Sequence, residues 1–65
     1  MEWIKATADT LPPIGKKVVW KWIWGGLTNA YYSELWIDLE YGTIFSTWDN
    51  YVDPLHQECY WLKED

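Results

Sequence analysis

Apolar and polar side chains alternate with a period of two along most of the chain, most clearly over residues 16–24. A period of two in aromatic and β-branched residues predicts a β-strand with one face toward the core. Lysines mark one face of this strand as the wetter one, so we expect the tryptophans on the other face to point inward. The last of them, beside a turn, should be partly exposed. The inward set is Val18, Trp20, Trp22 and Trp24, and the lysines are Lys17 and Lys21.

Turn-forming residues divide the rest of the chain into further short strands. Gly25-Gly26 predicts a two-residue hairpin because both glycines tolerate positive φ. Pro12 and Pro13 leave room for at most one short helical turn before residue 16. Other strands are expected over 3–4, 27–32, 35–41, 44–48 and 56–62, with turns near Ser33-Glu34 and Gly42-Thr43 and a loop over 49–54.

These elements predict one all-β domain over residues 1–65. Its expected form is a small antiparallel meander sheet, or a partly open barrel, of four to six short strands. The chain holds seven Trp, five Tyr and one Phe. A domain this short hides only roughly 60% of the surface of its unfolded chain, so large rings are needed to build a core, and some of them should reach solvent.

Few residues could carry catalysis or hold a metal. Cys59 is the only cysteine, which excludes an intramolecular disulfide, and His56 is the only histidine. A structural zinc site usually takes four such ligands. In a strand, a spacing of three residues puts Cys59 and His56 on opposite faces, and His56 has no evident orienting partner. No glycine-rich loop leads into a helix. We therefore predict that the protein is not an enzyme and binds no cofactor and no metal.

Charge is unevenly distributed around the formal net charge of −5. The chain up to Ser33 carries four lysines and two acids, whereas the chain from Glu34 onward carries eight acids and one lysine, and arginine is absent. This argues against binding to duplex nucleic acid and permits a partner protein with a basic surface. The chain has no apolar run long enough for a membrane span and no secretory leader, so we expect no membrane association and a cytoplasmic location.

An acidic row around a tryptophan is the strongest candidate for a binding surface. Its residues between positions 34 and 40 alternate along the chain with Leu35, Ile37 and Leu39, which we expect to form the core face. Exposed aromatics surrounded by charge are typical interface anchors, and a negative field steers basic partners. The alternative is a solvated acidic strand that only prevents edge-to-edge aggregation. The candidate partner-binding residues are Glu34, Trp36, Asp38 and Glu40, with Asp49 and Asp53 from the following loop.

A series of short motifs runs along the whole chain: Trp3-Ile4, Asp9, Leu11-Pro12, Gly15, Val18-Val19, Ala30-Tyr31-Tyr32, Leu35-Trp36-Ile37 and Tyr60-Trp61-Leu62. Their order resembles a family of short phage and prophage proteins of uncharacterised function. Members typically begin Trp-Ile, carry an Asp-x-Leu-Pro-x-x-Gly segment before a Val-rich strand, and finish with a Trp-containing strand. Members often end in a His-Trp pair and a proline-rich tail, whereas this chain has Tyr60-Trp61 and no proline after it.

The resemblance implies an accessory protein that is encoded by a bacteriophage and acts inside the bacterial host cell. Our leading hypothesis is a non-catalytic protein that binds and inhibits a host bacterial protein with a basic surface, an antiviral defence factor being one option. One alternative is a structural or self-associating phage protein, including a homodimer formed through an exposed strand edge. Another is an aromatic platform that binds single-stranded nucleic acid or a glycan.

Overall fold

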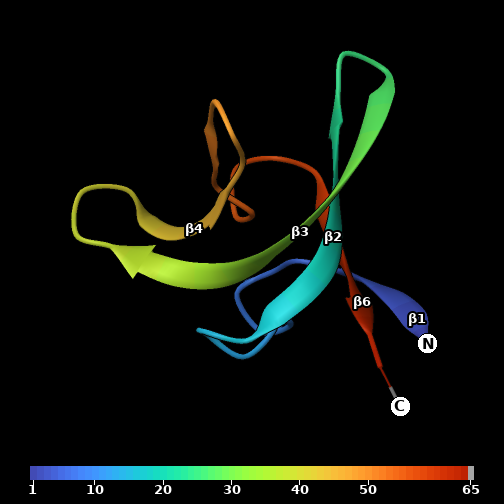
Figure 1. The fold of residues 1–65 in the computed structure, drawn as a ribbon, viewed down its shortest axis with the longest axis horizontal. Helices are drawn as coiled ribbons and strands as arrows, with labels where there is room; N and C mark the ends of the chain where they lie inside the picture. The colour runs from blue at the N-terminus through green and yellow to red at the C-terminus, as the bar shows by residue number, and fades with distance from the viewer. Residues whose placement is uncertain (65) are drawn as a thin grey trace.

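Six antiparallel strands and no helix are found in the computed structural model, which describes residues 1–64 (Figure 1). The all-β prediction is confirmed. Strands β2 to β5 follow one another as a meander, while β6 returns to lie between β1 and β2, which gives the order β1-β6-β2-β3-β4-β5. No helix in this range is long and apolar enough to cross a membrane. The strands are β1 (Glu2–Lys5), β2 (Lys17–Trp24), β3 (Leu27–Asp38), β4 (Gly42–Ser46), β5 (Tyr51–Val52) and β6 (Cys59–Lys63).

A two-residue turn joins β2 to β3, as predicted. Trp24 lies opposite Leu27, so only Gly25 and Gly26 form the turn. Their φ angles are 58° and 81°, in the left-handed region that such a hairpin turn requires at both central positions. The hairpin projects away from the rest of the molecule (Figure 1).

Strand β3 runs without a break across the predicted turn at Ser33-Glu34, so that prediction is wrong. The polar dipeptide marks the place where the strand changes partner. Residues 27–34 pair with β2, and residues 35–38 pair with β4. The Ser33 hydroxyl accepts a hydrogen bond of 2.6 Å from the Trp20 indole N–H, which fixes this position inside the sheet. The long, curved β3 thereby connects both halves of the sheet around one core (Figure 1).

Trp20 is the centre of the core, with 0% of its surface exposed. Its ring stacks on Phe45 at 4.5 Å between centroids and contacts Tyr31 at 4.9 Å. Across the β2–β6 pair it lies opposite Trp61. The other members of the core cluster are Ala6, Val18, Leu35, Val52 and Cys59.

The inward row of β2 becomes more exposed toward the hairpin tip, as expected. Trp20 is buried, Trp22 is half-buried and Trp24 is 66% exposed. Two of the core indole N–H groups have partners, because Trp20 donates to Ser33 and Trp61 donates to the Thr10 carbonyl at 2.7 Å. The Trp22 indole nitrogen is buried and has no partner.

Because Trp61 has a hydrogen-bond partner and Trp22 has none, replacing each by phenylalanine should lower the free energy of unfolding by different amounts. Trp22→Phe and Trp61→Phe remove the same ring volume, but only the second breaks a hydrogen bond, and only the first removes a buried donor that has no partner. An unpaired buried group costs about 1–3 kcal/mol, so Trp61→Phe should lower the free energy of unfolding by at least about 1 kcal/mol more than Trp22→Phe. Chemical denaturation of the two variants measures this difference. Equal costs would mean that the Trp61 hydrogen bond contributes nothing.

The predicted core face of residues 35–41 is correct only at its first position. Leu35 is buried, but Ile37 is mostly exposed and Leu39 fully exposed, because β3 runs past the core after Leu35 and pairs there only with β4. The strand ends at Asp38, so Glu40 lies in a turn and not on a strand face. The turn predicted at Gly42-Thr43 lies instead over residues 39–41, before β4.

Two boundaries near the C-terminus also differ from the prediction. The expected loop over 49–54 contains the short strand β5, because Val52 is drawn fully into the core beside Phe45. The last strand begins at Cys59, later than residue 56. Before it, the Asp53 carbonyl accepts hydrogen bonds from the N–H groups of His56 and Gln57, so residues 53–57 form a single helical turn.

Candidate functional site

Three aromatic rings form a second small cluster on the face of β3, β4 and β5 that points away from the core. The Trp36 ring meets Tyr51 edge-on at 5.5 Å, and the Tyr51 ring is inclined by 30° to Tyr41, with 6.5 Å between the centroids. Trp36 is half-buried and lies opposite Ile44, which is 1% exposed although it is not part of the main core cluster. Tyr41 and Tyr51 are each 59% exposed. The rings are thus held by packing while two of them still face solvent.

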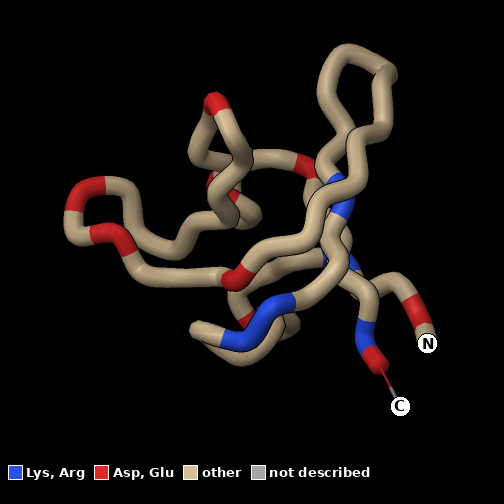
Figure 2. Tube along the Cα trace, in the orientation of Figure 1, with Lys and Arg blue, Asp and Glu red and all other residues tan. Residues whose placement is uncertain are grey.

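Several carboxylates lie next to these rings along the chain. Glu34 precedes Trp36 on the same face of β3, Glu40 adjoins Tyr41, and Asp49 lies two residues before Tyr51. Between Lys21 and Lys63 the chain carries six acids and no lysine. The acids of the turn after β3 and of the loop after β4 lie apart from the lysines (Figure 2), whereas Glu34 lies opposite Lys17 on β2. We call this surface the acidic aromatic face; it comprises Glu34, Trp36, Glu40, Tyr41, Asp49 and Tyr51.

The structure places three of the six residues predicted from the sequence in two adjoining grooves. Glu34 and Trp36 line one shallow groove with Lys17 and Ser46, and Asp49 lines the adjoining groove with Ser46 and Tyr51. Sequence reasoning did not select Tyr41 or Tyr51. Tyr51 was placed in a loop, and the signal that could have identified it is the Tyr51-Val52 pair, an aromatic beside a β-branched residue.

Asp38 stabilises a turn on the acidic side of the molecule. Its carboxylate accepts hydrogen bonds from the backbone N–H groups of Glu40 at 2.7 Å and Tyr41 at 2.9 Å. Short acidic side chains stabilise turns in this way. Its charge adds to the acidic aromatic face, but the role of its side chain in the fold is to fix the turn that presents Tyr41.

Asp53 does not join the acidic aromatic face. Its carboxylate accepts a hydrogen bond from the Leu55 N–H at 2.9 Å and lies 2.6 Å from the His56 Nδ1. Both contacts lie within the 53–57 turn. His56 therefore does have an orienting partner, which the sequence did not reveal, because the helical turn brings residues three apart together.

Asp38 holds a turn whereas Glu40 is exposed, so replacing each by alanine should affect stability differently. Asp38→Ala should lower the free energy of unfolding by about 1 kcal/mol, since it removes the acceptor of two turn N–H groups. Glu40→Ala should change it by less than about 0.5 kcal/mol, because it removes only an exposed side chain. Thermal and chemical unfolding of the two variants distinguish them. Should both variants unfold alike, the Asp38 carboxylate would have no structural role.

Cys59 is inert at neutral pH. The thiol is fully buried, and burial together with the charges of Asp53 and Glu58 raises the pKa of Cys59 to about 12. The His56 side chain is 81% exposed. The two groups therefore do not form a nucleophile–base pair. Residues 1–64 contain no cluster of three or more metal-ligating side chains.

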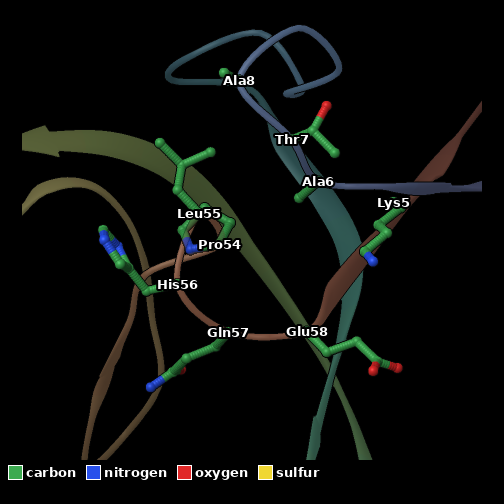
Figure 3. Close-up of a pocket in the computed structure, with 9 residues that line it drawn as sticks. All are labelled: Lys5, Ala6, Thr7, Ala8, Pro54, Leu55, His56, Gln57 and Glu58. Carbon is green, nitrogen blue, oxygen red and sulfur yellow. The ribbon is translucent and has the colours of Figure 1, made fainter.

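A groove of about 460 Å³ lies between two turns and is shown in Figure 3. Residues 5–8 form one wall and residues 54–58 the other, with Ala6 and Pro54 buried between them. Figure 3 shows His56 and Gln57 pointing outward, away from Ala6. The His56 ring of this groove is hydrogen-bonded to Asp53, which lies outside the lining.

The chain matches no protein-family model, and no curated protein or solved structure gives a significant match. The case for a function therefore rests on the chemistry of its surface.

Proposed function

We propose that the chain is a non-catalytic binding domain whose acidic aromatic face docks onto a basic surface of a partner protein. The observation that carries the proposal is the set of neighbouring rings Trp36, Tyr41 and Tyr51, with Glu34, Glu40 and Asp49 close to them along the chain. Aromatic residues held rigid at a surface act as interface anchors, because little conformational entropy is lost when they are buried.

Charge supports the same kind of partner. The acidic aromatic face creates a negative field that raises the association rate of a basic protein and selects against acidic ones. Such binding should weaken as salt is added, because exposed charges are screened within about 8 Å at physiological ionic strength.

In its most specific form, the proposal is that the chain is a phage-type accessory protein, which binds and inhibits a host bacterial protein in the cytoplasm. The order of motifs from Trp3-Ile4 to Tyr60-Trp61 supports this setting through its resemblance to short phage proteins. The acidic aromatic face would block a basic functional surface of the host protein, such as that of an antiviral defence factor.

A second candidate function is self-association through the β2–β3 hairpin. Residues 22–33 carry no charged side chain, and the tip exposes Trp24 and Leu27, at 66% and 65% (Figure 2). Exposed apolar patches of this kind mark sites of association. A structural or homodimeric protein would use this tip and would not depend on the acidic aromatic face.

An affinity capture with matched charge variants tests the proposal. The protein is immobilised and exposed to bacterial lysate, and bound proteins are quantified by mass spectrometry. Glu40→Lys with Asp49→Lys reverses two charges of the acidic aromatic face, and Glu2→Lys with Asp9→Lys makes the same charge change elsewhere.

We expect a partner that is captured by the wild type and the control but reduced at least about tenfold by the face variant, as is typical for close charge pairs at interfaces. Equal capture by all three proteins, or equal loss in both variants, would rule out the acidic aromatic face.

A further inference from the structure

A small pocket opens where β2 and β6 separate. These strands pair from Trp22 opposite Cys59 to Trp20 opposite Trp61. Beyond that point β2 still includes residues 17–19 and β6 residues 62–63, but no pairing between the two strands is found in this part of the described chain. The resulting fork encloses about 220 Å³ and is lined by Pro13, Lys16, Lys17, Val18, Trp61, Leu62, Lys63 and Glu64.

The pocket has a fixed apolar lining. Val18 and Trp61 belong to the buried core cluster. The segment that carries Pro13 is anchored on both sides, because the Trp61 indole donates to the Thr10 carbonyl at 2.7 Å and the Gly15 N–H donates to the Leu35 carbonyl at 2.8 Å. The cavity is therefore a built feature of the fold and does not depend on one loose side chain.

Three of the five lysines of this acidic protein line the pocket. Lys63 has the parity of the inward-facing Trp61 on β6, and Lys16 lies directly before β2, at the turn that carries Pro13. Lys17 has the opposite parity to Val18 and lies across from Glu34. Glu64 is the one described acid in the lining, and Glu2 lies opposite Lys63 on β1. Within residues 1–64, none of the lysine side chains makes an ion pair. Their ammonium groups are available to an external anion.

We propose that this fork pocket binds a carboxylate carried on a small aliphatic group, as at the C-terminus of a peptide. Lys16 and Lys63 hold the carboxylate, and Val18, Trp61 and Pro13 receive the aliphatic part. Charge-assisted hydrogen bonds to an ammonium are about twice as strong as neutral ones, and the apolar lining adds burial of the attached group. The volume is below the roughly 300–1,000 Å³ of ordinary small-molecule sites, so one terminal residue fits the pocket better than a cofactor does.

The test is a titration of isotope-labelled protein with N-acetyl-leucine, followed by amide and indole NMR shifts. Saturable shifts are expected at the amides of Val18 and Leu62 and at the Trp61 indole. The neutral N-acetyl-leucinamide and the small anion acetate should each bind about tenfold more weakly, because one lacks the charge and the other the aliphatic group. Inorganic phosphate tests whether the pocket recognises any anion, and it should also bind more weakly than N-acetyl-leucine.

Matched lysine variants complete the test. Lys16→Gln with Lys63→Gln should weaken binding of N-acetyl-leucine about tenfold, while Lys5→Gln with Lys21→Gln, which makes the same charge change outside the pocket lining, should leave it within about twofold. Equal binding of the acid and its amide, equal loss in both lysine pairs, or shifts that do not saturate would each overturn the proposal. Glu40→Lys with Asp49→Lys should not affect this titration, so the pocket and the acidic aromatic face are tested separately.

Discussion

Trp20→Ala is expected to remove at least about half of the free energy of unfolding of this chain. Removal of a fully buried tryptophan costs about 3–5 kcal/mol. Domains have a stability of about 0.05–0.15 kcal/mol per residue, which gives about 3–10 kcal/mol for this chain. The loss should be at the upper end of the range, because the ring stacks on Phe45, contacts Tyr31 and donates its N–H to Ser33. Loss of near-ultraviolet circular dichroism and of amide shift dispersion would report it.

Trp48→Ala is the matched control for this substitution. It removes the same side chain at a position that is 99% exposed, so we expect the free energy of unfolding to change by less than about 0.5 kcal/mol. If Trp20→Ala and Trp48→Ala melted at similar temperatures, the core would not be organised around Trp20.

The Cys59 thiol is expected to react about a thousandfold more slowly in the folded protein than in the denatured chain. Burial, with smaller contributions from Asp53 and Glu58, raises the pKa of Cys59 from 9.0 to about 12, and the thiolate is the reactive form. At a pH below the pKa of a thiol, each increase of one in that pKa lowers the fraction present as thiolate tenfold. Reaction with a disulfide reagent at pH 8, with and without guanidinium, measures the ratio. Comparable rates in the two states would mean that the thiol is accessible.

The raised pKa of Cys59 also makes folding stability depend on alkaline pH. Below pH 9 the thiol is protonated in both the folded and the unfolded chain, so it adds no pH dependence there. Between pH 9 and about 12 the unfolded chain loses the proton while the folded chain keeps it, which favours unfolding. Wild-type protein should therefore lose stability over this range relative to Cys59→Ala. Parallel stability curves would contradict the raised pKa.

Alternation along the sequence predicted where side chains point, but not what covers them. On β2 the parity was sufficient, because β3 and β6 flank the strand on both sides and the inward row meets the core. On β3 the same parity failed at Ile37 and Leu39, since the strand runs past the core and pairs there only with β4. The position of β6 between β1 and β2 was likewise not predictable, because periodicity contains no information on which distant strands pair.

The prediction of the acidic aromatic face from the sequence was limited in the same way. Parity correctly placed Glu34 and Trp36 on the face of β3 that points away from Leu35. It did not show that Asp38 and Asp53 serve turns, because a carboxylate that accepts backbone hydrogen bonds and one that faces solvent look alike in sequence. The clustering of Tyr51 with Trp36 depends on the short strand β5, which forms only once Val52 is packed in the core.

Site-specific photo-crosslinking in bacterial cells tests the central claim most directly. A photoreactive phenylalanine derivative is placed at Tyr51, in the acidic aromatic face, or at Trp24, at the uncharged hairpin tip. We expect position 51 to capture a bacterial protein with a basic surface, with a yield that falls as salt is raised in lysate, and position 24 not to capture it. Capture of that protein from position 24 alone, or of only a second copy of this chain from both positions, would contradict the account.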